Sequence, residues 1–214
     1  MNISQVEEGY KRFAQPRFES HQIQNQDLQG LMKLYRDEEL KSKRRLFLSE
    51  AVTSQTAKTI VSDLLILDSM SHEPIHLFLN SPGGEVNSGF SIYDTIRFIE
   101  SPVTIISTGL CASIATIINI AVPKPRRISM PNTRFLIHQP LISGQVYGQA
   151  SDIEITATQI IQIREKLNRM LADACGHDFK KVEQDTVRDH WMSAGEALDY
   201  GLVGRVVTSQ SEIS

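Results

Sequence analysis

The chain has 214 residues, of which 41% are hydrophobic and 22% are charged, a composition typical of a globular protein with one full core. Its net charge of −3 gives no electrostatic reason to bind nucleic acid or an anionic membrane, so we expect neither as a partner. Two cysteines are too few for a disulfide framework and favour a reducing compartment.

Residues 1–44 differ from the rest of the chain. They are rich in Gln, Glu, Arg and Lys and have few apolar residues before Leu28. The first residues lack the apolar core of a secretory signal peptide, so we expect no such signal. Leu28, Leu31, Met32 and Tyr35 have the spacing of one face of a short amphipathic helix. We expect the stretch before that helix to be flexible, or ordered only by a partner.

From Leu46 onward, segments typical of strands alternate with segments typical of helices. We expect strands within residues 44–52, 74–80, 103–109, 126–130 and 133–138, and helices over residues 54–70, 86–100, 113–122 and 151–174. Strands and helices that alternate in this way form βαβ units, so we expect an α/β fold with a largely parallel sheet. The apolar run inside the third helix is too short to span a bilayer.

The helix expected from Ser151 is unusually well marked. Ser151 and Glu154 have the spacing of a capping box. Its apolar face consists of Ile153, Ala157, Ile160, Ile161, Leu167, Met170, Leu171 and Ala174. Ile155 and Ile163 lie off that face. Either a second side of the helix is buried against another subunit, or these two are ordinary surface isoleucines.

Ser113 stands where the third expected strand gives way to an apolar helix. Gly109 and Ala112, both small, precede it. A serine on a tight strand-to-helix turn can present its oxygen as a nucleophile, and the start of the helix offers free N–H groups to an oxyanion. The surrounding sequence does not match G-x-S-x-G. A serine that only caps the helix has the same sequence signature, so both interpretations stay open.

A nucleophilic serine needs a base, and His138 is the best placed of the six histidines. It closes the last expected strand, and open α/β sheets place functional groups at strand ends. A carboxylate must then orient the imidazole. Asp185 and Asp189 are the candidates, and the residues alone do not choose between them.

The segment NSPGGEVNSG, residues 80–89, follows the second expected strand. Pro82, Gly83 and Gly84 allow a sharp turn in which backbone N–H groups face a ligand. The segment matches neither the dinucleotide-binding motif nor the P-loop motif. Beside a serine nucleophile it fits an oxyanion hole, and a plain tight turn is the alternative.

Five segments together resemble the ClpP family, the proteolytic subunits of the ATP-dependent Clp protease. They are LFLNSPGGEVNSGFSIYDTIRFI, GLCASIATIINIAV, RFLIHQPL, GQASDIEI and DTVRDHWMSAGEALDYGLV, and they occur in the family's order. The resemblance implies a serine endopeptidase that cuts unfolded proteins to short peptides. It implies no metal or cofactor in this subunit, because ATP is used by a partner unfoldase.

Carried over position by position, the resemblance also implies the site. Ser113 falls on the family's nucleophile and His138 on its general base. The family's aspartate is the second acid of its D-x-x-R-D segment, which selects Asp189. The backbone N–H groups of Gly84 and Ile114 fall on the oxyanion hole.

The architecture implied by the resemblance is the ClpP/crotonase-like βαβ spiral with a protruding handle helix. The protease domain would cover residues 45–208, with the handle at about 140–174 and a tail at 209–214. Subunits would form two stacked heptameric rings, as a homo- or hetero-oligomer, and Arg188 matches an arginine that pairs across the rings. The implied partners are unfolded proteins and an AAA+ Clp unfoldase of the ClpX, ClpA or ClpC type, in a bacterial cytoplasm.

Three features depart from the usual family pattern. Residues 1–44 do not match its N-terminal segment, which forms axial loops and part of the edge that docks the ATPase. Ile114 and Ala115 stand where the family usually has Met-Gly, and a β-branched side chain is stiffer. The segment HQPLISGQVYGQ is longer than the commonest form. These departures resemble divergent second paralogues, which often assemble with a partner paralogue.

Two other classes of function fit parts of the sequence. A structural or low-activity subunit of a mixed ring would share the fold, but such subunits usually lack triad residues. A crotonase-like acyl-CoA enzyme could use the same P-G-G turn, but it would leave the serine, histidine and aspartate unexplained. We therefore expect a serine endopeptidase that is weak alone and active in a ring complex.

Overall fold

The computed structural model of the chain describes residues 25–141 and 148–213. The stretch before residue 25, expected to be flexible or ordered by a partner, lies outside the described residues, and so do residues 142–147 of the lengthened segment. No helix in the described ranges is long and apolar enough to cross a membrane.

The chain divides into two compact units, residues 1–39 and residues 40–214. Helix α2 (Asn25–Ser42) contains the amphipathic stretch expected from the sequence. Leu34 and Tyr35 on this helix are exposed. Every other helix and strand that the structure describes belongs to the second unit.

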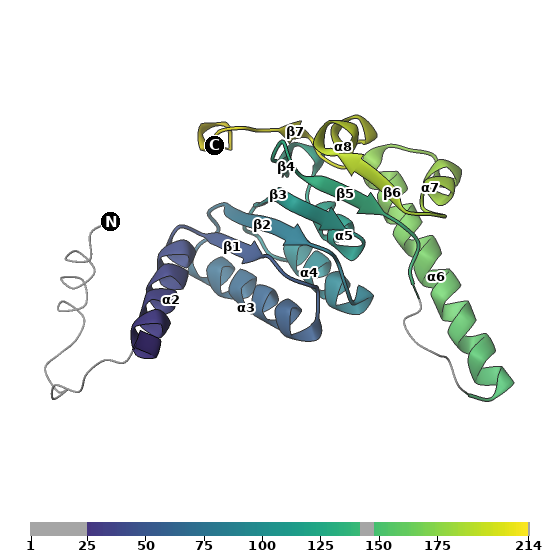
Figure 1. Ribbon diagram of the computed structural model, residues 1–214, viewed down its shortest axis with the longest axis horizontal. Coiled ribbons are helices and arrows are strands. Elements are labelled where there is room, and N and C mark those ends of the chain that lie inside the picture. The colour runs from purple at the N-terminus through teal and green to yellow at the C-terminus, as the bar shows by residue number, and fades with distance from the viewer. Residues whose placement is uncertain (1–24, 142–147, 214) are drawn as a thin grey trace, which may run out of the picture. The chain divides into compact units, whose positions relative to one another are not determined.

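One seven-stranded sheet forms the centre of the second unit (Figure 1). In chain order, the strands are β1 (Arg45–Leu48), β2 (Ile75–Ser81), β3 (Val103–Ala112), β4 (Arg127–Ser129), β5 (Arg134–Ile137), β6 (His190–Ser193) and β7 (Arg205–Val206). The main path runs β1–β2–β3–β4–β7, and all of its pairs are parallel. The α/β fold with a largely parallel sheet is confirmed.

Strand β3 pairs with different strands along its length. Its middle pairs with β4, whereas its last residues pair with β5, so that Ala112 faces Leu136 in a parallel register. Strand β6 then joins β5 in the antiparallel direction, with Ile137 opposite His190. This branch brings the carboxyl ends of β3 and β5 and the start of β6 to the same edge of the sheet.

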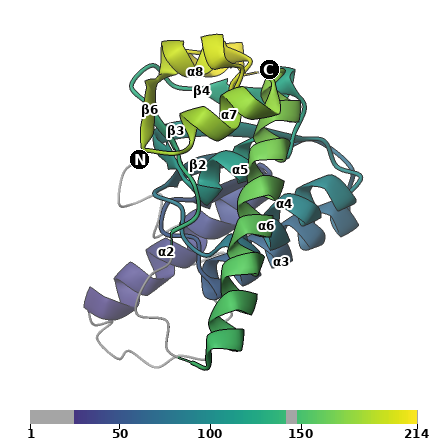
Figure 2. The ribbon, with the colours of Figure 1, turned by 90° about the vertical axis from the view of Figure 1, so that its right-hand side faces the viewer.

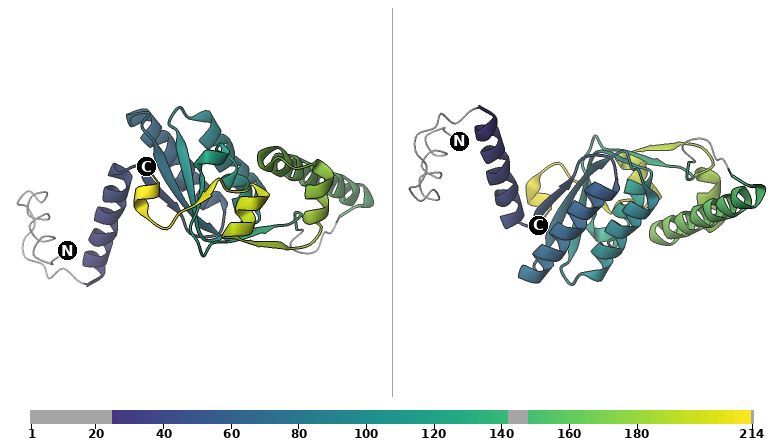
Figure 3. Two further views of the ribbon diagram at one scale, coloured as in Figure 1. Left: turned by 90° about the horizontal axis from the view of Figure 1, so that it is seen from above. Right: turned by 90° about the horizontal axis from the view of Figure 1, so that it is seen from below.

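Six α-helices follow α2 in the described residues: α3 (Ser54–Met70), α4 (Val86–Phe98), α5 (Ile114–Asn119), α6 (Ala150–Cys175), α7 (Phe179–Asp185) and α8 (Ala194–Tyr200). Helices α3 and α4 lie side by side and cover one face of β1–β3 (Figure 3). Their helically spaced apolar residues, Ile60, Leu64, Ile92 and Ile96 among them, are buried in the main core. Burial of these side chains is what holds the two helices on the sheet.

Polar contacts hold the carboxyl end of α3. The Arg44 guanidinium donates to the carbonyls of Leu67 at 2.9 Å and Glu73 at 2.8 Å. Asp68 accepts hydrogen bonds from the Ser101 N–H at 2.8 Å and the Ser101 hydroxyl at 2.7 Å. Burial raises the pKa of Asp68, but these hydrogen bonds outweigh burial and hold its pKa at about 2.

Most of the expected elements are confirmed, with small differences at their ends. The capping box expected at Ser151 is wrong, because α6 begins at Ala150 and its N-cap residue, Gln149, makes no side-chain cap bond. Ser151 therefore lies inside the helix and cannot cap it. The sequence patterns did not predict α7, β6, α8 or β7, because each covers too few residues for a periodic pattern to emerge.

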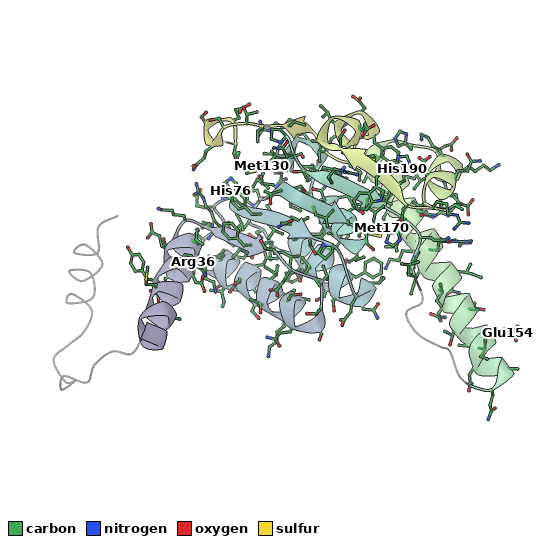
Figure 4. All side chains as sticks on the ribbon, viewed as in Figure 1. Arg36, His76, Met130, Glu154, Met170 and His190 are labelled. Carbon is green, nitrogen blue, oxygen red and sulfur yellow. The ribbon has the colours of Figure 1, made fainter. Side chains whose placement is uncertain are left out.

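Helix α6 extends well beyond the sheet (Figure 2). In its outer half Ile153 and Ile155 are exposed, Ile155 to 61%. Figure 4 shows Glu154 near the end of the helix that is far from the sheet. In the inner half Leu167 and Leu171 are buried in the core. The protruding handle helix is confirmed, and the single chain leaves Ile153, Ile155 and Ile161 exposed.

Candidate active site

Ser113 occupies the tight junction between β3 and α5. Strand β3 ends at Ala112 and α5 begins at Ile114, so a single residue turns the chain. Ser113 does so with φ 56° and ψ −127°, a conformation that residues other than glycine rarely adopt. Strained conformations of this kind persist where the surrounding structure enforces them, and they cluster at active sites.

The hydroxyl of Ser113 does not cap α5. Ser113 stands at the N-cap position, but its side chain makes no cap hydrogen bond. Both the N–H and the hydroxyl of Thr116 donate to the Ser113 carbonyl, at 2.9 and 2.7 Å. Among the described residues the Ser113 hydroxyl has no hydrogen-bond partner. Of the two interpretations, a helix cap or a nucleophile, this geometry favours the nucleophile.

His138 lies beside Ser113 because β3 and β5 are parallel neighbours. The ladder that pairs Ala112 with Leu136 continues to Ser113, whose N–H donates to the Leu136 carbonyl at 2.9 Å. The carboxyl ends of parallel neighbours meet at one edge of a sheet. The residue that follows β5 is therefore next to the residue that follows β3.

Ser113 and His138 line the same pocket. The rest of its wall is mostly aliphatic and is formed by Val86, Ile114, Thr116, Ile117, Ile137, Pro140, Leu167, Asn168 and Leu171. The His138 side chain is only 12% exposed, so the surrounding wall restrains the ring. A pocket of this kind can receive an apolar side chain of a peptide whose carbonyl carbon lies at the Ser113 oxygen.

Asp189 lies beside the Nδ1 atom of His138. Because β6 is antiparallel to β5, the residue before His190 lies opposite the residue after Ile137. The Asp189 Oδ1 atom is 3.8 Å from His138 Nδ1, an ion-pair distance that is too long for a hydrogen bond. The Asp189 side chain is 63% exposed. Arg188, directly before it, is also exposed.

Asp185 is engaged elsewhere. Its Oδ2 atom accepts hydrogen bonds from Lys181 Nζ and from the Tyr200 hydroxyl, both at 2.8 Å. Burial raises the pKa of Asp185, but these two bonds outweigh burial and lower it. Burial and the neighbouring Asp185 carboxylate also raise the pKa of Tyr200. Of the two candidate carboxylates, only Asp189 lies within ion-pair distance of His138 among the described residues.

Gln139, which the sequence did not single out, ties the histidine segment to the aspartate segment. Its N–H donates to the Thr186 carbonyl at 2.8 Å, and its side-chain Nε2 donates to the Val187 carbonyl at 3.0 Å. These bonds join the residue after His138 to the chain just before Asp189. Its only sequence signal is its position directly after the histidine.

The P-G-G turn after β2 lies directly against Ser113. A Cβ atom added to Gly83 would stand 2.7 Å from the Ser113 Cβ and 3.1 Å from the Ile114 nitrogen, so only glycine fits. Val52 forms a bridge to Gly84 through two backbone hydrogen bonds. The Val52 N–H donates to the Gly83 carbonyl, and the Glu85 N–H donates to the Val52 carbonyl. The Gly84 N–H takes no part in that bridge. The Ile114 N–H is the first of α5, where a helix supplies no acceptor.

Helix α4 makes close contact with the start of α5. A Cβ atom added to Gly89 would overlap the Cγ1 atom of Ile114. The branched side chain of Ile114 therefore fills the space that glycine leaves open. This contact holds in place the residue that follows Ser113.

Comparison with known proteins gives a consistent result. The family model described as Clp protease matches residues 31–210. The chain is 49% identical over 170 residues to the ATP-dependent Clp protease proteolytic subunit 3 of Rhizobium johnstonii, which covers 79% of this chain and 87% of the relative. It is 46% identical over 171 residues to proteolytic subunit 2 of Pseudomonas aeruginosa, covering 80% of this chain and 84% of the relative.

A solved structure supports the same assignment. A mutant of ClpP1 from Listeria monocytogenes superposes with a TM-score of 0.77 at 37% identity. The match covers 83% of this chain and 98% of that structure. Sequence and fold agree over the part of the chain that contains the pocket, and this chain belongs to the Clp protease family.

Proposed function

We propose that this protein is a proteolytic subunit of an ATP-dependent Clp protease, a serine endopeptidase that cuts unfolded proteins into short peptides. The observation that carries the proposal is that Ser113, on a strained turn, shares a pocket with His138, whose Nδ1 atom lies 3.8 Å from Asp189 Oδ1. Relatives named as proteolytic subunits of this protease support it, because this chain matches them over most of their length.

In the proposed mechanism, Ser113 Oγ attacks the carbonyl carbon of the substrate peptide bond while His138 Nε2 takes the serine proton. The negative charge that forms on the carbonyl oxygen accepts hydrogen bonds from the N–H groups of Gly84 and Ile114. His138 then gives the proton to the leaving amine, and the remaining peptide is held as an ester on Ser113. A water molecule, deprotonated by His138, releases that peptide and restores the serine.

The role proposed for Asp189 is to orient the ring and to stabilise its charged form. A carboxylate beside Nδ1 favours the tautomer that leaves Nε2 free to accept the serine proton. It also attracts the imidazolium that forms during attack. Support comes from the ion-pair distance of 3.8 Å and from the hydrogen bonds of Gln139, which hold the two segments together.

Membership of the family supports a ring assembly that works with a Clp ATPase. We propose two stacked heptameric rings, either of this chain alone or with a paralogue, in a bacterial cytoplasm. The uncovered isoleucines on the outer half of α6 support a further buried contact there. Arg188 is proposed to pair across the rings, and the unfoldase is proposed to be of the ClpX, ClpA or ClpC type. The subunit would need no cofactor, because the unfoldase uses the ATP.

One observation favours low activity for the subunit on its own. The contact between His138 and Asp189 exceeds hydrogen-bond length, and Asp189 is largely exposed. Hydrogen bonds between catalytic groups often tighten only in a working complex. A low-activity subunit of a mixed ring is therefore the second candidate. It predicts that the protein becomes more active when it is assembled with a paralogue.

A serine-directed probe tests the proposal. A fluorophosphonate should label the assembled protein on Ser113, and Ser113→Ala should abolish the labelling. Ser49→Ala, a change at an exposed serine far along the chain, is the matched control and should leave labelling intact. Labelling that persists in Ser113→Ala would overturn the assignment of the nucleophile. An absence of labelling in the wild-type particle, with and without a paralogue, would overturn the peptidase proposal.

A further inference from the structure

The P-G-G turn begins at a buried serine to which the proposed mechanism gives no role. Ser81 is the last residue of β2 and is 0% exposed. Its hydroxyl donates to the Glu50 carbonyl at 2.6 Å and accepts a hydrogen bond from the Gly83 N–H at 3.1 Å. A hydroxyl has one hydrogen to donate and lone pairs that accept, so both bonds can be made at once. Ser81 therefore joins the turn to the segment that follows β1.

The same segment holds the end of the turn. The Val52 N–H donates to the Gly83 carbonyl, and the Glu85 N–H donates to the Val52 carbonyl, both at 2.8 Å. Among the described residues, these bonds and that of Ser81 take up the first and third N–H groups of residues 83–85. They leave the N–H of Gly84, the one proposed for the oxyanion hole. The Ser81 hydroxyl thus accepts from the N–H directly before it.

A change of register in the sheet brings Ser81 close to the nucleophile. Between β2 and β3 the ladder advances by four residues on β3, from Ser107 to Cys111, while it advances by only two on β2, ending at Ser81. Ser81 is therefore paired with the residue two before Ser113. On the other side of the turn, a Cβ atom added to Gly83 would lie 2.7 Å from the Ser113 Cβ. A shift of this turn would change the position of its N–H groups relative to the nucleophile.

We propose that Ser81 is a positioning residue for the reaction, because its two hydrogen bonds fix the direction of the Gly84 N–H toward the oxygen of the attacked carbonyl. The inference rests on the proposed function, since that oxygen carries negative charge only when Ser113 attacks. Backbone donors stabilise such an oxyanion best when they already point at the place where it forms. Without the Ser81 hydroxyl, the buried Gly83 N–H loses its acceptor, and the turn moves to find another.

The test compares Ser81→Ala with the wild type on assembled particles, with any second type of subunit carrying alanine at its catalytic serine. A fluorogenic peptide gives kcat and KM, and a peptide aldehyde gives an inhibition constant. Ser113 Oγ adds to the aldehyde carbon, the serine proton passes to His138, and the carbonyl oxygen becomes the hemiacetal oxygen in the oxyanion hole.

We expect Ser81→Ala to lower kcat by about 10- to 100-fold, because a donor displaced by about 1 Å loses much of its effect on the transition state. The inhibition constant of the aldehyde should rise by about 10-fold, since the hemiacetal oxygen uses the same donor. KM should change by less than about threefold, because the uncharged carbonyl of the bound substrate gains little from that donor.

The inhibition constant separates positioning from a merely structural role. Particles with fewer working sites have a lower kcat, but the inhibition constant of the sites that remain is unchanged. Ser129→Ala is the matched control, because Ser129 is also a fully buried strand serine, and its hydroxyl donates to the Met130 carbonyl at 2.9 Å instead of to the turn. We expect the aldehyde to bind this variant as tightly as the wild type, and an equal rise in both variants overturns the inference.

An unchanged inhibition constant in Ser81→Ala also overturns it. If Ser81→Ala does not assemble, Ser81→Cys decides, because a thiol is only a weak donor and acceptor; we then expect a rise of about threefold, and an unchanged constant is the contrary result. Wild-type particles that react with the fluorophosphonate, combined with either contrary result, overturn only the role of Ser81. Wild-type particles that bind neither the aldehyde nor the fluorophosphonate overturn the proposed function as well.

Discussion

Replacing Asp189 by asparagine removes the charge that faces His138 and keeps the shape of the side chain. Two unit charges 3.8 Å apart, the separation of Asp189 Oδ1 and His138 Nδ1, attract by about 1 kcal/mol in water and about 4 kcal/mol at an effective dielectric constant of 20. These energies correspond to about 6-fold and about 10³-fold in rate. Because Asp189 is largely exposed, the electrostatic loss in rate lies nearer the smaller of these two factors. Loss of the correct imidazole tautomer adds to it, and the combined loss in rate can reach about 10⁴-fold. We predict a loss in kcat on the order of 10³-fold.

The assay is turnover of a fluorogenic peptide by particles whose oligomeric state has been checked by sedimentation. Asp185→Asn is the matched control, because it makes the same chemical change on a carboxylate that bonds Lys181 and Tyr200 instead of His138. We expect it to lower stability and to affect kcat much less. If Asp185→Asn costs more turnover than Asp189→Asn in an intact oligomer, the assignment of the orienting carboxylate is wrong.

Three further predictions concern other residues. Gly89→Ala should push Ile114 away from α4. If the Ile114 N–H is an oxyanion donor, as proposed, a displacement of about 1 Å should lower kcat/KM by about 10²-fold. Wild-type turnover by a folded Gly89→Ala variant would contradict this prediction. The pKa of Asp68 is about 2, below its ordinary value of 3.8. The charged carboxylate therefore stabilises the fold at pH values above 3.8, and this stabilisation is lost as the pH falls toward 2. Asp68→Asn should thus lower the melting temperature at pH 7 more than at pH 2.5, and an equal loss at both pH values would refute the role given to the Ser101 hydrogen bonds. Arg188→Ala should shift double rings to smaller species and lower peptide turnover in the same sedimentation fractions, whereas a fully active single ring would separate assembly from catalysis.

The sequence by itself determined the elements whose patterns are local and long. The helical spacing of residues 54–70 and the apolar run of β2 (Ile75–Ser81) predict the observed elements because burial of one face repeats over several turns or several alternations. The junction at Ser113 was also visible, since a strand pattern meets a helix pattern there. The resemblance to the ClpP family came from several such segments in a fixed order.

The tertiary structure decided what those residues do to one another. Whether Ser113 caps α5 depends on a hydrogen bond that its side chain does not make to the helix. Asp185 and Asp189 look equivalent in the sequence, and only the antiparallel register of β5 and β6 brings one of them to His138. Register and burial between segments far apart in the chain depend on the packing of the whole core, and no local pattern encodes them.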